Sequence, residues 1–134
     1  MKSNIINKAF NFVEKINKHD LKNLIKLMST DHTLIVFDNN PEKGKNIMKN
    51  AWKSYFDICP NYMIYISQYA IKNDTVSFLG RTTGSHRKIS RIDEFEETLI
   101  FTATIKNNRI SKWQLLNDTP DNRKSVNLEE KYII

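Results

Sequence analysis

The sequence predicts an α+β domain in which three helices pack on one face of a strongly curved, mainly antiparallel sheet. In the first 60 residues, apolar side chains recur at three- and four-residue spacing, which is typical of amphipathic helices. From residue 62 onward the pattern changes to long apolar-rich runs separated by short Asn- and Asp-containing turns, which is typical of antiparallel strands. A bent sheet covered by helices forms a cone with an apolar interior, and small-molecule pockets are commonly built in this way.

Two helices are expected to open the chain. An apolar stripe runs through residues 5–16 and predicts a first helix that ends near Lys18. Asp20 can cap a second, short helix over residues 21–28, because its carboxylate can accept backbone N–H bonds that the first turn leaves unpaired.

A strand and a third helix are expected next. The run from Thr33 to Phe37 predicts a buried strand, and the turn at residues 41–44 leads into a helix that Pro60 ends. One side of this helix carries the apolar residues Ile47, Met48, Ala51, Trp52, Tyr55 and Phe56.

The remaining chain is expected to form a four-strand meander. The predicted strands cover residues 62–71, 75–86, 95–105 and 109–116. The charged segment 87–94 has no clear period and predicts an exposed loop. We therefore expect a single domain over residues 1–118, followed by a polar tail over residues 119–134 that is mobile or docks on a partner.

Composition narrows the classes of function. The chain has 134 residues, and its single cysteine, Cys59, excludes an intramolecular disulfide and offers no metal cluster. The N-terminus lacks the continuous apolar run of a signal peptide or a membrane span, so we expect a cytoplasmic protein with no membrane association. The formal net charge is +6, but the basic residues are scattered and no nucleic-acid motif accompanies them, so we do not expect nucleic-acid binding. The one dense basic patch consists of His86, Arg87, Lys88 and Arg91.

Several stretches together resemble a known family. The segments "INKHDLKNLIKLMSTDHTLIVFD", "AWKSYFDICPNYMI", "TVSFLGRTTGSH" and "RISKWQLLND", in this order and with Gly44 between the first two, are similar to the SnoaL-like branch of the nuclear transport factor 2-like (NTF2-like) superfamily. The resemblance covers roughly residues 5–118 and implies the NTF2-like cone, a cystatin-like α+β fold. It does not specify an activity, because this fold hosts isomerases, cyclases, dehydratases, epoxide hydrolases and non-catalytic proteins.

Asp38 is the first candidate catalytic residue. The resemblance implies an acid at the end of the first strand, where ketosteroid isomerases carry their proton-shuttling base. Strand alternation places Asp38 on the face of Leu34 and Val36, so that a cone interior on this face would partly desolvate the carboxylate and raise its pKa. The alternative is that Asp38 only accepts backbone hydrogen bonds in the Asp-Asn-Asn-Pro turn.

The electrophilic partner of such a base is missing. The resemblance implies that the oxyanion-hole positions of ketosteroid isomerases fall here on Phe12 and Leu99, neither of which can donate a hydrogen bond. Steroid isomerisation by that mechanism is therefore not expected.

A second candidate acid lies at the end of the last strand. Polyketide cyclases of the SnoaL type carry a catalytic Asp four residues after a Trp, which here is Asn117 after Trp113, and Asp118 follows. Alternation places Asn117 and Asp118 on opposite faces, but one bulge would exchange them, so the inward residue stays open. Relatives of the W-x-x-x-x-D type favour Asp118, whose alternative role is a strand-ending turn.

Further candidates come from one histidine and from the aromatic residues. His86 ends the second meander strand and is a candidate acid, base or ligand contact, and no second ligand at metal-binding spacing accompanies it. An aromatic pocket wall is suggested by Trp52, Tyr55, Phe56, Tyr69 and Phe101, each of which could equally be plain core. The other residues expected to line the pocket are Phe12, Leu99, Trp113 and Asn117.

Two functions remain open from the sequence. One is an isomerase, cyclase, dehydratase or hydrolase that acts on a small apolar or carbonyl-containing molecule with Asp38 as general base, assisted by Asp118 or His86, and without a cofactor. The other is a non-catalytic ligand-binding or dimeric interaction protein. A homodimer through the sheet is expected in both cases, because a half-covered antiparallel sheet leaves an apolar face to hide.

Overall fold

The computed structural model describes residues 2–129, 132 and 133. The helices are α1 (Lys2–Asn17), α2 (Leu21–Lys26), α3 (Lys45–Ile58), α4 (Arg91–Glu96) and α5 (Pro120–Ser125). The strands are β1 (Met28–Val36), β2 (Glu42–Lys43), β3 (Met63–Lys72), β4 (Thr75–Thr83), β5 (Leu99–Lys106), β6 (Arg109–Asn117) and β7 (Tyr132–Ile133). The predicted α+β class and the four-strand meander are confirmed.

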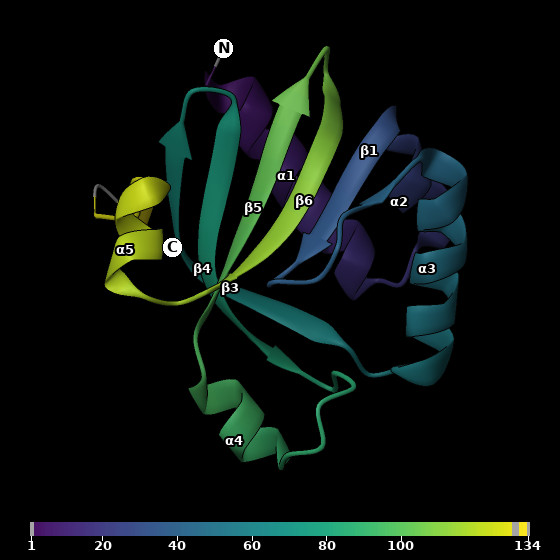
Figure 1. Cartoon of the computed structure of the whole chain (residues 1–134), viewed down its shortest axis with the longest axis vertical. Helices are drawn as coiled ribbons and strands as arrows, with labels where there is room; N and C mark the ends of the chain where they lie inside the picture. The colour runs from purple at the N-terminus through teal and green to yellow at the C-terminus, as the bar shows by residue number, and fades with distance from the viewer. Residues whose placement is uncertain (1, 130–131, 134) are drawn as a thin grey trace.

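One curved sheet organises the molecule (Figure 1). Its described strands follow the order β2-β1-β6-β5-β4-β3-β7, in which β1 and β6 run parallel and the other pairs antiparallel. Gly80 lies where β3 and β4 approach closely, because a Cβ added there would lie 2.7 Å from the carbonyl oxygen of Tyr65. This contact and the register shift between Ile66 and Gln68 accompany the bend of the sheet.

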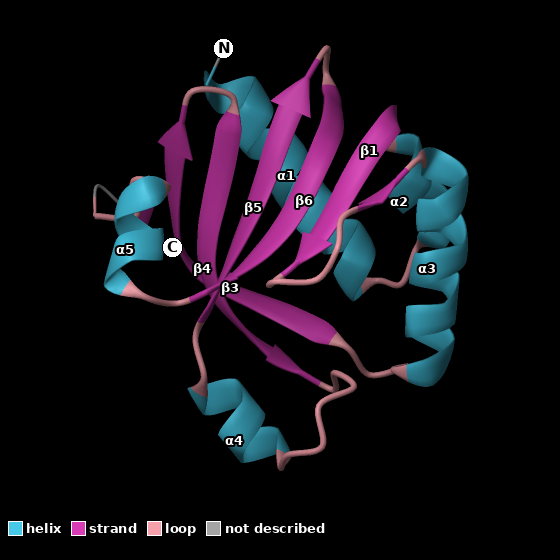
Figure 2. Cartoon of the chain, in the orientation of Figure 1, coloured by secondary structure: helices cyan, strands magenta, loops and turns pink. Residues whose placement is uncertain are grey.

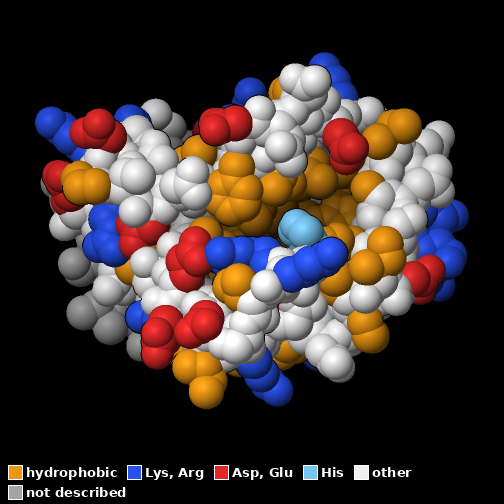
Figure 3. Space-filling model, turned by 60° about the horizontal axis from the view of Figure 1, so that its bottom comes forward, with side chains coloured by type: hydrophobic (Ala, Val, Ile, Leu, Met, Phe, Trp, Pro, Cys, Tyr) orange, Lys and Arg blue, Asp and Glu red, His pale blue; other side chains and the backbone are white. Residues whose placement is uncertain are grey.

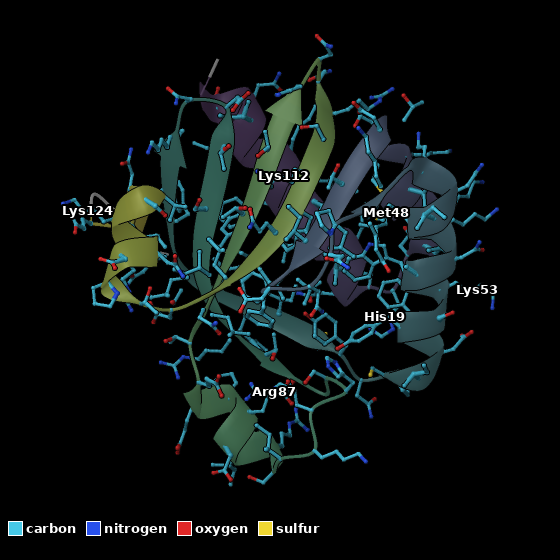
Figure 4. The ribbon with its side chains drawn as sticks, in the orientation of Figure 1. His19, Met48, Lys53, Arg87, Lys112 and Lys124 are labelled. Carbon is cyan, nitrogen blue, oxygen red and sulfur yellow. The ribbon has the colours of Figure 1, made fainter. Side chains whose placement is uncertain are left out.

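The inner face of the sheet, which we define as the face toward α1 and α3, carries the main core (Figure 2). The helix α1 buries Ala9, Phe12 and Ile16 completely. The helix α3 turns Met48 toward the sheet and Lys53 away from it (Figure 4). The predicted amphipathic helices therefore form and bury most of their apolar stripes, although Ile47 of α3 is 51% exposed.

The opposite, outer face is partly covered by the chain's own C-terminal segment. Leu128 is 1% exposed and forms a second core cluster with Ala70, Leu79 and Ile100. A guanidinium–carboxylate pair fastens the segment, because Arg123 donates from Nε and Nη2 to Asp118 over 2.6 and 2.8 Å. The tail was expected to be mobile or to dock on a partner, but its residues 119–129 pack on their own domain. Residues 130, 131 and 134 of the tail lie outside the described residues.

A second difference concerns the segment predicted as an exposed loop. Residues 91–96 form α4, which Ser90 caps by accepting a hydrogen bond from the backbone N–H of Asp93 over 3.1 Å. The helix is too short to show a period, which is why its pattern was missed. Among the described helices, none is long and apolar enough to cross a membrane.

Candidate functional site

A cavity of about 340 Å³ opens between the inner face of the sheet, α3 and the loops at their ends. Its apolar wall includes Leu34, Val36, Trp52, Leu99, Trp113 and Leu115. Its polar members on the β4 side are Tyr55, Tyr62, Thr82, Ser85, His86 and Arg87. Figure 3 shows the mouth as a hollow with exposed hydrophobic side chains and with a histidine and basic side chains at its edge. The volume lies within the range of ordinary small-molecule sites.

Asp38 does not reach this cavity, and the predicted inward orientation is wrong. Leu34 and Val36 line the cavity as strand alternation requires, but β1 ends at Val36. Phe37 then adopts a left-handed backbone with φ 52°, which breaks the alternation, and its own side chain joins the lining. Asp38 is exposed in the turn that follows.

The candidates at the end of β6 also lie outside the cavity. Asn117 is exposed, and its carbonyl accepts a hydrogen bond from the side-chain amide of Asn122 over 2.8 Å. Asp118 points to the outer side, where Thr98 Oγ1 donates to it over 2.5 Å in addition to the two bonds from Arg123. The hydrogen bonds and charge of Arg123 and the hydroxyl of Thr98 hold the pKa of Asp118 below its ordinary value, against the smaller opposing effect of burial. Asp118 therefore anchors α5 through its hydrogen bonds with Arg123.

His86 is the one predicted catalytic candidate at the cavity, where it forms a pair with Tyr55. The backbone N–H of His86 donates to the Tyr55 hydroxyl over 3.3 Å, and this hydroxyl lies 2.9 Å from His86 Nδ1. The hydroxyl and Nδ1 form a hydrogen bond in which the tautomer of the imidazole decides the donor. Burial raises the pKa of Tyr55 to about 12, so that the hydroxyl stays protonated.

Glu94 was missed by the sequence analysis and supports the same wall. It is 3% exposed, and Oε2 accepts hydrogen bonds from Thr82 Oγ1 over 2.6 Å and from the backbone N–H of Ser85 over 3.3 Å. No ion pair to this carboxylate is formed by the described residues. The acid therefore ties α4 and the loop before it to the end of β4, and this tie positions Ser85 and His86 at the mouth.

Tyr62 was also missed as a site residue; it was predicted to begin the first meander strand and lies directly before β3. It is 6% exposed, and its ring stands at right angles to that of Tyr55 with 5.1 Å between the centroids. Burial, followed by the negative charge of a Tyr55 phenolate and of Glu94, raises the pKa of Tyr62. In the sequence, one aromatic residue at the start of an apolar-rich run does not show whether it lines a pocket or belongs to the core.

The predicted aromatic wall divides between the cavity and the core. Trp52, Tyr55, Leu99 and Trp113 line the cavity. Phe12 and Phe101 pack on the far side of Trp113, with ring centroids 5.1 and 5.8 Å from it, and are fully buried. Phe56 stacks on His19 at 4.4 Å, and Tyr69 packs edge-on against Phe10, so these four residues form core behind the cavity.

The described residues contain no group of three or more His, Cys, Asp or Glu side chains placed to hold a metal ion. The polar groups of the cavity are hydroxyls, one imidazole and one guanidinium on the β4 side, with Asn39, Asn40 and Glu42 on the opposite rim. Such a site can enclose an apolar molecule and donate hydrogen bonds to it.

Comparison with known proteins identifies the fold. No family model matches the sequence, and no curated protein matches it. A SnoaL-like protein of unknown function from Burkholderia thailandensis superposes with a TM-score of 0.68 at 10% identity, covering 86% of this chain and 95% of the other. An NTF2-like protein of unknown function from Cytophaga hutchinsonii gives 0.67 at 9% identity, covering 85% and 89%.

A designed protein with a curved β-sheet is similar to the same degree, with a TM-score of 0.66 at 16% identity over 96% of this chain and 95% of the other. At such identities these likenesses concern the fold, and a sequence designed for shape shares it, so activity has to be argued from the site. The chain has the SnoaL-like, NTF2-like fold that its sequence resembles.

Proposed function

We propose that the protein binds a small, mainly apolar molecule in the cavity on the inner face of the sheet. The observation that carries this proposal is an opening of about 340 Å³ with an apolar wall and polar groups concentrated at the β4 side of its mouth. A pocket of this kind gains affinity from the apolar area that it removes from water, and its few polar groups fix the orientation of the ligand.

A general-base role for Asp38 is not part of this proposal. The side chain is exposed and does not line the cavity, so that it is neither desolvated nor in reach of an enclosed ligand. The placement favours the second of the two functions considered above, a ligand-binding protein, over an isomerase or cyclase that uses this acid.

The test is a titration with the apolar fluorophore N-phenyl-1-naphthylamine, whose emission rises in an apolar environment. We expect saturable binding that Val36→Trp abolishes, because an indole at this position fills the cavity. The matched control is Ile35→Trp, the neighbouring position in β1, which does not line the cavity and should keep the binding. Circular dichroism shows whether each variant folds.

Two results would overturn the proposal. One is the absence of saturable binding to the wild-type protein. The other is equal binding by folded Val36→Trp and Ile35→Trp, which would place the fluorophore outside the cavity.

A further inference from the structure

The polar groups of the cavity differ in whether they already have partners. Tyr55 is paired with His86, and the hydroxyl of Thr82 is paired with Glu94. The hydroxyl of Tyr62 has no hydrogen-bonding partner among the described residues. Four polar side-chain atoms of the described residues are fully buried without a hydrogen-bonding partner: His32 Nε2, Trp52 Nε1, Gln68 Oε1 and Ser77 Oγ. The Tyr62 hydroxyl is not among them, so it keeps some accessible surface. Since Tyr62 is 94% buried and lines the cavity, the accessible surface of its hydroxyl belongs to the cavity.

The backbone holds this hydroxyl in a fixed place. Tyr62 N–H donates to the carbonyl of Cys59 over 3.2 Å, and its carbonyl accepts a hydrogen bond from His19 Nε2 over 3.0 Å. The preceding residue, Asn61, packs so closely on Gly84 that a Cβ at Gly84 would lie 2.4 Å from the Asn61 carbonyl oxygen. The donor is therefore positioned before any ligand arrives, which lowers the ordering cost of binding.

The electrostatic surroundings of Tyr62 set the charge of the ligand group that can meet it. Burial and the nearby Glu94 carboxylate disfavour negative charge at the Tyr62 oxygen, so the hydroxyl stays protonated and acts as a donor. The same surroundings disfavour an anionic ligand group placed against this hydroxyl, because it would lie buried near Glu94. The one guanidinium of the cavity lining, that of Arg87, already pairs with Glu97 over 2.6 Å. A neutral acceptor such as a ketone or aldehyde oxygen has no such penalty.

From these observations we infer that the ligand is a neutral, apolar molecule with a carbonyl oxygen that accepts a hydrogen bond from Tyr62. This inference rests on the proposed binding function and adds the chemical class of the ligand and the residue that selects it. A buried donor without a partner penalises a ligand that lacks the acceptor, so selection works against the plain hydrocarbon as well as against the anion.

The experiment compares three ligands of one skeleton: 1-tetralone, tetralin and tetralin-1-carboxylate, each displacing N-phenyl-1-naphthylamine. In the wild-type protein we expect 1-tetralone to bind about three- to tenfold more tightly than tetralin, which corresponds to one net hydrogen bond, and the carboxylate to bind most weakly. Tyr62→Phe should bring the ketone-to-hydrocarbon ratio to about 1, with weaker binding of the ketone and equal or tighter binding of tetralin, because the variant removes both the donor and the penalty for leaving it unpaired.

The matched control is Tyr65→Phe. Tyr65 does not line the cavity, and its hydroxyl accepts a hydrogen bond from Thr83 over 3.4 Å. This variant should keep the wild-type ratio.

The outcomes separate this inference from the function on which it rests. If the fluorophore does not bind, the proposed function fails and the inference falls with it. If the fluorophore binds but the ketone has no advantage over tetralin, if the advantage survives in Tyr62→Phe, or if the carboxylate binds most tightly, then the binding function stands and the inference is overturned.

Discussion

The inner and outer faces of the sheet differ in what covers them. The inner face lies under α1 and α3, and the cavity opens between this face, α3 and the loops at their ends. The apolar part of the outer face is filled by the chain's own C-terminal segment, with Leu128 fully inserted. A hollow of about 380 Å³ remains on the outer face beside α5, and polar side chains such as Thr75, Thr102 and Thr104 line most of it. The two faces therefore differ in the chemistry of their hollows, because the hollow on the inner face has an apolar wall.

The rest of the outer face is polar. Two rows of paired residues cross it: Ser77, Thr102 and Gln114 form one row, and Thr75, Thr104 and Lys112 form the next. Lys112 stands on this face, and Lys124 lies on α5 (Figure 4). The homodimer through the sheet stays a prediction, and its apolar reason is weaker than expected. The C-terminal segment covers the apolar part of this face, and the remaining part carries hydroxyl and amine groups.

The largest loss of stability is expected from truncating Leu128, which holds the C-terminal segment on the outer face. Leu128→Ala removes a fully buried side chain between α5 and the sheet, and we expect it to lower the free energy of unfolding by about 2–4 kcal/mol. Urea denaturation measures this change. Lys124→Ala, at an exposed position of α5, is the control and should change stability by less than about 0.5 kcal/mol.

The same cover should control self-association. Against the homodimer predicted from the sequence, we expect the full chain to sediment as a monomer at micromolar concentration, because the C-terminal segment covers the apolar part of the outer face. Leu128→Arg should release the segment, expose Leu79 and Ile100, and shift sedimentation toward a dimer. A stable dimer of the full chain whose affinity Leu128→Arg does not change would contradict the role assigned to the segment.

A smaller loss of stability is expected from weakening the hydrogen bonds between Asp118 and Arg123. Asp118→Asn keeps the shape but weakens two charge-assisted bonds to Arg123, so we expect a loss of about 1–3 kcal/mol at pH 7. Since the folded pKa of Asp118 lies below its ordinary value of 3.8, this stability is present above about pH 4 and is lost as the pH falls through the folded pKa. The stability curves of the variant and the wild type should therefore approach each other as the pH falls below 3.8 and through the folded pKa, as followed by urea denaturation across pH.

On the inner face, His32 provides a pH-dependent effect of at most about 1.4 kcal/mol per pH unit. It is fully buried, and its Nδ1–H donates to the carbonyl of Ile110 over 2.7 Å. Burial lowers its pKa, so below about pH 6.5 the unfolded chain takes up a proton that the folded chain does not, and stability falls as the pH decreases. His32→Leu should flatten this slope between pH 6.5 and 5, whatever its absolute stability, and an unchanged slope would mean that other groups cause it.

The smallest effect is expected at Asp38. Because Asp38 is exposed and lies outside the cavity, Asp38→Ala should change neither ligand affinity nor stability by more than about 0.5 kcal/mol. If Asp38→Ala lowered the affinity for the fluorophore tenfold or more, the carboxylate would have to contact the ligand, and this prediction would be wrong.

The comparison also separates what local pattern can predict from what it cannot. Period-2 alternation grouped Leu34 with Val36 and Trp113 with Leu115, because it depends only on strand geometry, and the structure places both pairs on the cavity face. It failed at Asp38, where one left-handed residue, Phe37, ends the alternation, and such a backbone angle at a phenylalanine has no sequence signal.

Long-range partners explain the other misses. The role of Asp118 depends on Arg123 and Thr98, and the burial of Glu94 depends on Thr82, twelve residues earlier in the chain. Tyr62 becomes part of the site because Gly84, with φ 72°, lets the chain before β3 approach the end of β4. None of these contacts follows from the period or the composition of a single segment.

The most direct test of the central claim uses the two tryptophans of the chain, both of which line the cavity. Each gives one indole N–H signal in a 1H–15N NMR spectrum, and Trp52→Phe assigns them. On titration with 1-tetralone we predict that both indole signals shift and saturate together, while the backbone amides of Ser77 and Thr102 on the outer face stay in place. Indole signals that do not move, or shifts confined to the outer face, would contradict the assignment of the ligand to this cavity.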